Sequence, residues 1–419
     1  MHKIIIEGNN TLSGEIKISG SKNSAVALVP AAVLCDEEVT IANIPNISDI
    51  DALDEILCHL GAKVSRKGDL MTFDSSKIKN KVIPEGVAKK LRASYYFMGA
   101  LLGKFKKVEI YFPGGCSIGA RPINLHLKGF EALGATVEEK DNFFTITAEK
   151  LKGAKINLDF ASVGATINIM LAATKAEGTT VITNAAKEPH IVNVATFLNN
   201  MGAKISGAGT SEIKIIGVEK LHSCFHEVVP DYVETGTYMI LASVIGKDVI
   251  IKNVIPDHVE SLISKLEDVG VPLEIGIDFI KISAPEKLNA TNVRTQVYPG
   301  FPTDLQQPFA TLLTQSKGKS VITETIYENR FLNLNELNVM GATTEILTNS
   351  KAVILGPTKL TGAEVKATDL RAGAGLVIAG LIADGKTIIE DADYILRGYE
   401  NIIEKLTKIG AKITLEEIK

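Results

Sequence analysis

The chain has 419 residues, of which 45% are hydrophobic and 22% are charged, and its formal net charge is −4. This composition indicates a globular protein with buried cores, and the mixed distribution of charges does not indicate binding to DNA or RNA. No apolar stretch approaches the ~20 residues that span a bilayer, and no signal-peptide core follows Met1, so we expect a cytoplasmic protein without membrane insertion.

A short pattern recurs along the whole chain: an apolar residue, a glycine, a small residue and then a strand-like run. An amphipathic helical pattern, such as Leu53, Ile56, Leu57 and Leu60, precedes the glycine, which is therefore predicted to end a helix in the left-handed conformation. We interpret the chain as six repeats. Their glycines are 68 to 73 residues apart, at Gly61, Gly134, Gly202, Gly270, Gly341 and Gly410.

The repeats predict an α/β fold of six βαβαββ-like units. Segments 162–176 and 370–383 are rich in small residues and predict buried helices, each of which precedes a strand. Runs rich in β-branched residues predict strands at 39–44, 181–184, 249–254, 321–325 and 387–391.

Six such units exceed the usual size of one hydrophobic core, so we expect two domains of three units each. The expected domains are residues 22–229, and residues 1–21 together with 230–419. Clefts between domains are common places for active sites, and we expect the active site there.

The basic residues are 38 lysines and only seven arginines. When lysine supplies the routine surface charge, arginine is expected where its planar fork binds phosphate or carboxylate. Helix N-termini also attract anions. The pattern therefore favours an anionic substrate, because five of the seven arginines stand where a predicted helix begins: Arg92, Arg121, Arg330, Arg371 and Arg397.

The four cysteines are far apart and include no CxxC pair, which argues against disulfides and structural zinc. Cys116 lies in a glycine-rich loop, Pro113-Gly-Gly-Cys-Ser-Ile-Gly-Ala-Arg-Pro122, where a backbone can approach a ligand closely, so we expect Cys116 to be functional. Cys35 and Cys58 lie in apolar helical contexts and are interpreted as inert core residues.

Asp304 follows a turn rich in proline and glycine. Two interpretations stay open for it: an N-cap formed together with Thr303, or a general base in a loop that faces the cleft.

Eight motifs occur in order along the chain, and together they resemble the UDP-N-acetylglucosamine 1-carboxyvinyltransferase family, the UDP-GlcNAc enolpyruvyl transferases. This resemblance implies an inside-out α/β barrel of two domains, each with three repeats. The motifs cover residues 19–24, 116–126, 162–166, 234–237, 301–304, 328–331, 369–372 and 397–400.

The resemblance implies a transferase that moves enolpyruvate from phosphoenolpyruvate to the 3′-hydroxyl of UDP-N-acetylglucosamine and releases phosphate, in the first committed step of peptidoglycan biosynthesis. It implies no metal and no organic cofactor. It makes Cys116 the general acid, the site of a phosphoenolpyruvate adduct and the target of fosfomycin, and Asp304 the acceptor of the hydroxyl proton.

The resemblance also implies the remaining site residues. The anionic groups would be held by Lys22, Arg92, Arg121, Arg371 and Arg397, of which Lys22 and Arg397 also take part in catalysis, and Asn23 would orient the sugar. The nucleotide would rest on Arg121, Pro122, Ile123, Asn124 and Leu125, with Ser162, Val163, Gly164 and Ile326 nearby.

Two positions depart from the family pattern: Asn124 stands where aspartate is usual, and Phe160 where many members have lysine. Two alternative functions remain. A sister enzyme transfers enolpyruvate to shikimate 3-phosphate, but it lacks a loop like that of Cys116. A silent paralogue that binds UDP-sugar would have no reason to keep Cys116, Asp304 and Arg397.

Overall fold

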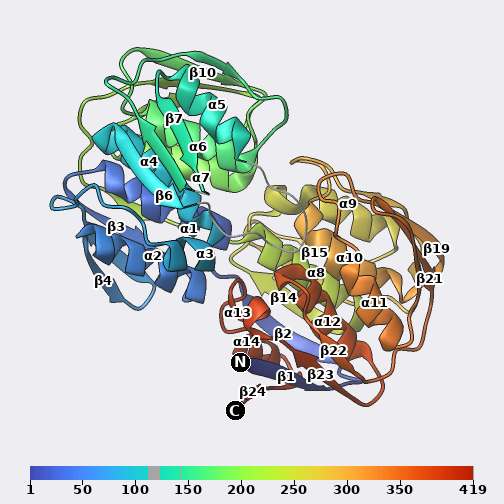
Figure 1. Cartoon of the computed structure of the whole chain (residues 1–419). Helices are drawn as coiled ribbons and strands as arrows, with labels where there is room; N and C mark the ends of the chain where they lie inside the picture. Colours follow the sequence, from blue (N-terminus) through green and yellow to red (C-terminus); the bar gives the residue numbers. More distant parts are fainter. Residues whose placement is uncertain (112–122, 142, 419) are drawn as a thin grey trace. The chain divides into compact units, whose positions relative to one another are not determined.

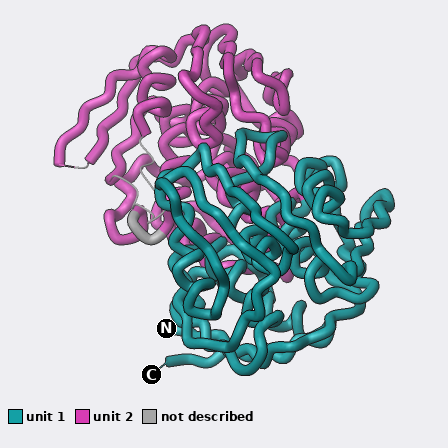
Figure 2. Tube along the Cα trace, turned by 90° about the vertical axis from the view of Figure 1, so that its right-hand side faces the viewer, with its two compact units in different colours: residues 1–19, 116–120, 230–419 teal, residues 20–115, 121–229 magenta. Residues whose placement is uncertain are grey.

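The computed structural model describes residues 1–111, 123–141 and 143–418, and its architecture mixes helices with small sheets (Figure 1). The chain divides into two compact units (Figure 2). Unit 1 contains Met1–Ser19 and resumes at Pro230, whereas unit 2 begins at Gly20 and ends at Val229. Cys116, Arg121 and Pro122 lie outside the described residues.

Unit 2 contains three sheets within the described residues. The first has the order β13 (Phe225–Glu227), β3 (Glu38–Ala42), β5 (Leu70–Asp74), β4 (Lys63–Lys67). The second has the order β6 (Lys107–Tyr111), β8 (Phe143–Thr147), β7 (Thr136–Lys140). The third has the order β11 (Lys204–Ser206), β12 (Glu212–Ile216), β10 (Thr179–Thr183), β9 (Lys155–Asn157).

Unit 1 also contains three sheets in its described part. One has the order β15 (Leu273–Ile275), β16 (Phe279–Ile282), β14 (Gly246–Lys252), β2 (Leu12–Lys17). Another has the order β17 (Leu288–Asn289), β19 (Ser316–Thr323), β21 (Lys351–Gly356), β20 (Thr343–Thr348), with β18 (Val293–Arg294) also on β19. The last has the order β22 (Glu364–Lys366), β23 (Lys386–Glu390), β1 (His2–Glu7), β24 (Lys412–Glu417).

Five of these six described sheets share one hydrogen-bonding plan: a parallel pair followed by two antiparallel pairings. In the sheet of β6, an isolated parallel bridge between Ile83 and Ile110 stands where the others have a strand. The N-terminal strands β1 and β2 complete two sheets of unit 1, because β1 pairs with β23 and β24 while β2 pairs with β14.

Each unit has its own hydrophobic core, formed around three buried helices. In unit 2 these are α1 (Lys22–Ala31), α4 (Tyr96–Phe105) and α6 (Val163–Ala173), and in unit 1 they are α8 (Tyr232–Ile245), α10 (Thr303–Leu313) and α12 (Leu370–Ile382). Their small and apolar residues allow close packing on all sides. Six further helices, each with both buried and exposed residues, complete the units: α2 (Ser48–Leu60), α5 (Asn124–Ala132), α7 (Pro189–Asn200), α9 (Glu260–Asp268), α11 (Leu332–Val339) and α14 (Ile402–Lys408) in the described part of the chain.

The remaining helical segments are short. They are η1 (Ala32–Leu34), α3 (Glu85–Lys90), η2 (Arg92–Tyr95), η3 (Pro256–Val259) and α13 (Asp393–Leu396).

The six repeat glycines all adopt left-handed backbone angles, with φ between 91° and 106°. Each lies just after the end of one of these six helices, as Gly61 does after α2. The prediction of six helix-ending glycines is therefore confirmed. The predicted buried helices at 162–176 and 370–383 are confirmed as α6 and α12, and the five predicted strands correspond to β3, β10, β14, β19 and β23, with ends that differ by a few residues.

One expectation about the cysteines is wrong. Cys35 is buried as expected, but Cys58 is exposed. The buried stripe of α2 includes Leu53, Ile56, Leu57 and Leu60, and Cys58 falls outside this stripe on the helix surface.

Candidate active site

Several of the predicted site residues lie where the buried helices begin. In unit 2, Lys22 and Asn23 open α1, Arg92 opens the 3-10 turn η2 that leads into α4, and Ser162 caps α6. In unit 1, Asp304 and Arg371 lie in the first turns of α10 and α12. The first N–H groups of a helix have no acceptor within the helix, and they can donate to an anion instead. Each unit therefore contains several helix N-termini that are suited to binding anions.

Lys22 is held at the start of α1 by a carboxylate. Its Nζ lies 2.8 Å from Oδ2 of Asp49, which is in the first turn of α2, and both side chains are largely buried. The Ser21 hydroxyl accepts a hydrogen bond from the Ser24 N–H and caps the helix. The ammonium group is thus fixed in position rather than extended into solvent.

The predicted nucleotide contacts of unit 2 lie on α5 and α6. Ile123 and Leu125 are buried at the start of α5, whereas Asn124 is exposed. The Ser162 hydroxyl accepts from the Ala165 N–H, and the Ser162 carbonyl accepts from the Thr166 N–H. These bonds leave the N–H groups of Val163 and Gly164 without an acceptor among the described residues.

Two arginines bind the carboxylate of Asp304. Arg330 Nη2 lies 2.6 Å from Oδ1, and Arg371 Nη2 lies 3.3 Å from Oδ2. The arginine side chains are only 2% and 4% exposed, while the carboxylate is 29% exposed. The N-cap of α10 is Pro302, without a side-chain cap, so the structure gives no support to an N-cap role for Asp304.

Arg371 is itself held on several sides. Its guanidinium carbon lies 5.3 Å from the centre of the Tyr399 ring, whose hydroxyl is 2.8 Å from Thr237 Oγ1 on α8. Burial by itself would lower the pKa of the Arg371 guanidinium, but the oxygens of Tyr399, Asp304 and Asp231 raise this pKa above its ordinary value. Arg371 therefore keeps its positive charge in a buried setting.

Glu324 organises the loop that carries Ile326. This carboxylate is 2% exposed and accepts hydrogen bonds from Thr295 Oγ1 at 2.8 Å, Thr303 Oγ1 at 2.9 Å and the Ile326 N–H at 2.7 Å. It therefore ties the loop after β19 to the start of α10, next to Asp304.

The other predicted positions lie on several different elements. Asn23 and Ile326 are partly buried. Arg397 is the C-cap of the short helix α13 and precedes α14 by five residues, so the prediction that it stands where a helix begins is wrong. Phe160 is 55% exposed. Among the described residues, no group of three or more His, Cys, Asp or Glu side chains could hold a metal ion.

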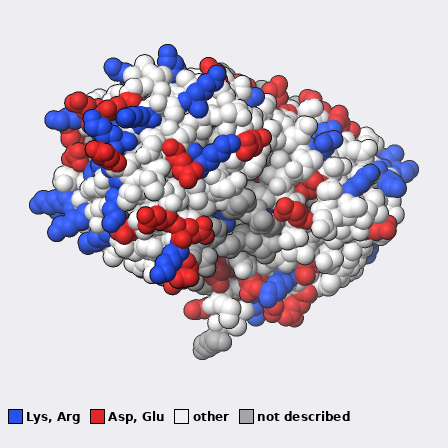
Figure 3. Space-filling model, turned by 45° about the horizontal axis from the view of Figure 1, so that its top comes forward, with Lys and Arg blue, Asp and Glu red and all other residues white. Residues whose placement is uncertain are grey.

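On the face shown in Figure 3, basic and acidic side chains are interspersed. No described helix is long and apolar enough to cross a membrane.

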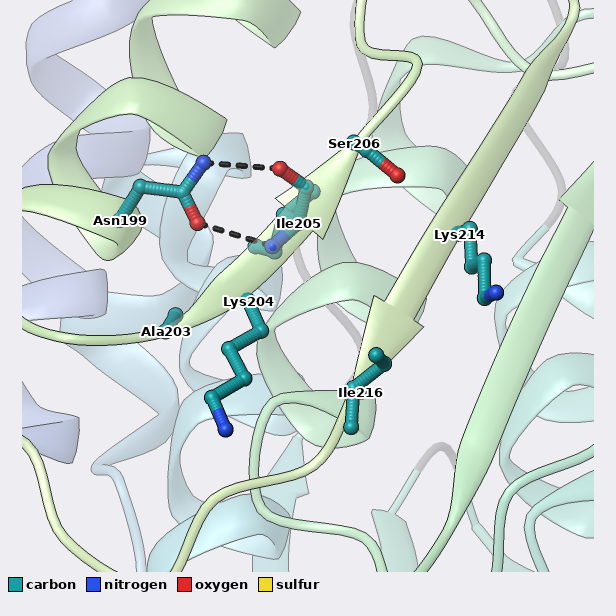
Figure 4. A pocket seen from close by; sticks show the side chains of 7 residues that line it. All are labelled: Asn199, Ala203, Lys204, Ile205, Ser206, Lys214 and Ile216. Atoms are coloured by element: carbon teal, nitrogen blue, oxygen red, sulfur yellow. Dashed lines mark hydrogen bonds between the residues drawn. The ribbon is translucent and has the colours of Figure 1, made fainter.

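One pocket of about 370 Å³ lies elsewhere in unit 2, on β11 and β12 (Figure 4). The Asn199 side chain donates to the Ile205 carbonyl and accepts from the Ile205 N–H, so its amide is already used to bind this strand. None of the predicted site residues is among its lining residues, Asn199, Ala203, Lys204, Ile205, Ser206, Lys214 and Ile216.

Two contacts at the candidate site cannot be predicted from the sequence. The repeat pattern places Arg330 near a helix entry but does not reveal its ion pair with Asp304, and it does not indicate the hydrogen bonds of Glu324. A carboxylate at the end of a β-branched strand was the only available signal for Glu324, and such a residue is usually solvated.

Comparisons with known proteins identify what this arrangement resembles. A family model described as EPSP synthase (3-phosphoshikimate 1-carboxyvinyltransferase) matches residues 6–406. A UDP-N-acetylglucosamine 1-carboxyvinyltransferase 2 of Geobacillus kaustophilus (strain HTA426) is 54% identical over 418 residues, which cover 100% of this chain and 97% of that relative. A protein of the same name from Listeria monocytogenes is 53% identical over 412 residues, covering 98% and 97%.

Solved structures of this kind share the fold. The enolpyruvyl transferase NikO from Streptomyces tendae has a TM-score of 0.91 at 26% identity, and the match covers 100% of this chain and 99% of that one. An EPSP synthase from Acinetobacter baumannii has a TM-score of 0.76 at 19% identity, with both chains fully covered. The second likeness concerns the fold alone.

Proposed function

Because the chain belongs to the UDP-N-acetylglucosamine 1-carboxyvinyltransferase family, we infer that it transfers the enolpyruvyl group of phosphoenolpyruvate to UDP-N-acetylglucosamine and releases phosphate. The observation that carries this inference is the identity of 52–54% over the full length of relatives with that activity in their name. The product serves peptidoglycan biosynthesis.

Asp304 is the proposed acceptor of the proton from the attacking 3′-hydroxyl. Its carboxylate is fixed by buried Arg330 and Arg371, yet it keeps an exposed fraction of 29% through which a hydroxyl group can reach it. A base must lie within hydrogen-bond distance of the proton it removes, and a fixed carboxylate satisfies this at low entropic cost.

The cations at the helix entries are proposed to bind the carboxylate and phosphate of phosphoenolpyruvate. Lys22 is held by Asp49 and Arg371 by Tyr399, so neither side chain must reorganise when an anion arrives. Fixed positive groups stabilise developing charge better than mobile ones. Arg92, Arg121 and Arg397 complete this set in the proposal, and Arg121 lies outside the described residues.

Cys116 is the proposed general acid and the site of the covalent phosphoenolpyruvate adduct, and it also lies outside the described residues. Its assignment rests on the glycine-rich motif of residues 113–122. In forming the adduct, the thiolate sulfur would bond to C2 of phosphoenolpyruvate while C3 takes up a proton.

The finer architecture belongs to the same proposal. We place the six repeats in an inside-out barrel of two domains, 22–229 and 1–21 with 230–419, with the active site in a cleft between them that closes on the substrates and excludes water. The proposed nucleotide contacts are Asn23, Pro122, Ile123, Asn124, Leu125, Ser162, Val163, Gly164 and Ile326. We also place the protein in the cytoplasm, because its phosphorylated substrates do not cross a bilayer unaided.

The experiment that tests this function measures phosphate release from phosphoenolpyruvate with either acceptor. Release with UDP-N-acetylglucosamine and none with shikimate 3-phosphate supports the proposal. Release with shikimate 3-phosphate alone would assign the activity named in the description of the family model, and release with neither would indicate the silent paralogue.

A further inference from the structure

A buried histidine lies beside the N-terminus of α6. His126 comes from α5 and is 5% exposed. The ideal position of a Cβ atom on Gly164, in the first turn of α6, is 2.8 Å from Cε1 and 3.0 Å from Nε2 of His126. The Tyr95 ring meets the imidazole edge to face, with centroids 5.0 Å apart. The ring is therefore fixed along the first turns of α6.

The proton on this histidine is assigned by a chain of hydrogen bonds. The Gly99 N–H donates to Oδ1 of Asn168, so this atom of the side chain must be the oxygen. The other atom is then the NH₂ group, which lies 2.9 Å from Nδ1 of His126 and must donate to it. Nδ1 therefore carries no proton.

The imidazole is neutral. Burial, and secondly the charge of Arg92, lower the pKa of His126 to about 3. A neutral imidazole that accepts at Nδ1 must carry its proton on Nε2. No described residue accepts a hydrogen bond from this Nε2–H group.

Three unused donors thus meet at one place. They are His126 Nε2–H and the backbone N–H groups of Val163 and Gly164, none of which has an acceptor among the described residues. Asn168 and Gly164 are one helical turn apart on α6. Nδ1 of the imidazole contacts Asn168, and Nε2 lies beside Gly164, nearer the N-terminus of the helix. Donors at a helix N-terminus suit a phosphate oxygen.

We propose that Asn168 is a positioning residue that holds His126 with its proton on Nε2, so that this N–H donates to a diphosphate oxygen of the nucleotide sugar bound at the start of α6. The proposal rests on the proposed function, since it concerns the same substrate. It adds two residues to the binding machinery: His126 as a donor and Asn168 as the group that selects its tautomer.

The tautomer is tested by ¹⁵N NMR of the full-length protein labelled at histidine, with the His126 signals identified by their loss in His126→Gln. We expect Nε2 to be protonated and its resonance to move when UDP-N-acetylglucosamine is added. In Asn168→Leu, which cannot donate to Nδ1, both tautomers are expected. A wild-type ring protonated at Nδ1, or an Nε2 resonance that ignores the ligand, would overturn the proposal.

Binding is tested by calorimetry with UDP and with UDP-N-acetylglucosamine. His126→Leu is expected to weaken both about 10- to 100-fold, as for a lost hydrogen bond to a charged group, and Asn168→Leu about twofold to tenfold. His126→Gln, whose amide nitrogen can replace Nε2, should retain most of the affinity. The KM for phosphoenolpyruvate should stay unchanged.

A matched control exists in the same unit. Asn193, on α7, accepts a hydrogen bond from the Val229 N–H, and its nitrogen lies 2.9 Å from Nε2 of His226, so this amide binds a different histidine. Asn193→Leu should therefore leave nucleotide affinity unchanged. If the wild type does not bind UDP-N-acetylglucosamine, the proposed function fails. If it binds, and His126→Leu and Asn168→Leu bind as tightly, only the present proposal fails.

Discussion

Asp304 and Arg330 form an ion pair of 2.6 Å in which the guanidinium is almost fully buried and the carboxylate remains partly exposed. Arg330 Nη2 also lies 3.4 Å from the carbonyl of Thr303, the first residue of α10. The arginine therefore holds both the side chain of Asp304 and the backbone beside it.

Replacing Arg330 by lysine should lower kcat about 10- to 100-fold. A single ammonium group cannot reproduce the planar fork, and small displacements of a catalytic group cost rate factors of this size. Steady-state kinetics with both substrates measure the effect. Arg66→Lys is a matched control, because Arg66 binds Asp51 and Asp54 at the surface of unit 2. An Arg330→Lys enzyme with the wild-type kcat would contradict the positioning role.

Replacing Gly164 by alanine should weaken nucleotide binding and destabilise unit 2 by about 1–3 kcal/mol. The added methyl group would lie 2.8 Å from the His126 ring and 3.0 Å from the Tyr95 hydroxyl, and overpacking in a core costs free energy of this order. Urea unfolding and calorimetry provide the measurements. Gly86→Ala, where no atom lies within 4 Å of the new methyl group, should be neutral or slightly stabilising. Equal effects at the two glycines would refute this reasoning.

Acid should destabilise unit 2 through His226. Burial lowers the pKa of this histidine from 6.5 to about 4. Between these values the unfolded chain binds a proton that the folded protein does not bind, so stability falls as the pH drops from about 6.5 to about 4, by about 3 kcal/mol in total. Above pH 6.5 the histidine is neutral in both states and has no effect.

Urea unfolding at several pH values checks this prediction. His226→Gln should lose less stability than the wild type over the same interval, because glutamine at this position does not titrate. Parallel stability curves for the two proteins would show that His226 is not responsible.

The repeat pattern predicted much of the fold because it depends on local physics. Gly61 and its five counterparts end helices in a conformation that other residues adopt at a cost, so their spacing marks the units directly. The same repeat pattern predicted that most of the arginines stand near the starts of helices, where unpaired backbone N–H groups already favour anions. It therefore indicated the anionic character of the substrate as well.

The partners within the site could not be predicted in this way. Arg330 reaches Asp304, and Asn168 reaches His126, only because the fold brings together elements that are distant in the sequence. Asn168 did leave a signal, as the one amide side chain in a buried and mostly apolar helix, since such a group needs a partner. The sequence does not reveal which partner it finds.

Fosfomycin should label Cys116 and no other thiol. Burial raises the pKa of the Cys35 thiol, and burial raises that of Cys224 to about 11, so neither forms a reactive thiolate readily. Mass spectrometry of the intact protein and of its peptides measures the adduct. Cys116→Ser should lose labelling, whereas Cys58→Ser, which removes the exposed thiol of α2, should keep it. Labelling that persists in Cys116→Ser would identify another target.

The acceptor substrate is the central claim, and the mass of the reaction product tests it most directly. After incubation with phosphoenolpyruvate, UDP-N-acetylglucosamine should gain one enolpyruvyl group for each phosphate released. An unchanged nucleotide sugar, in the presence of active, folded protein, would contradict the assigned function.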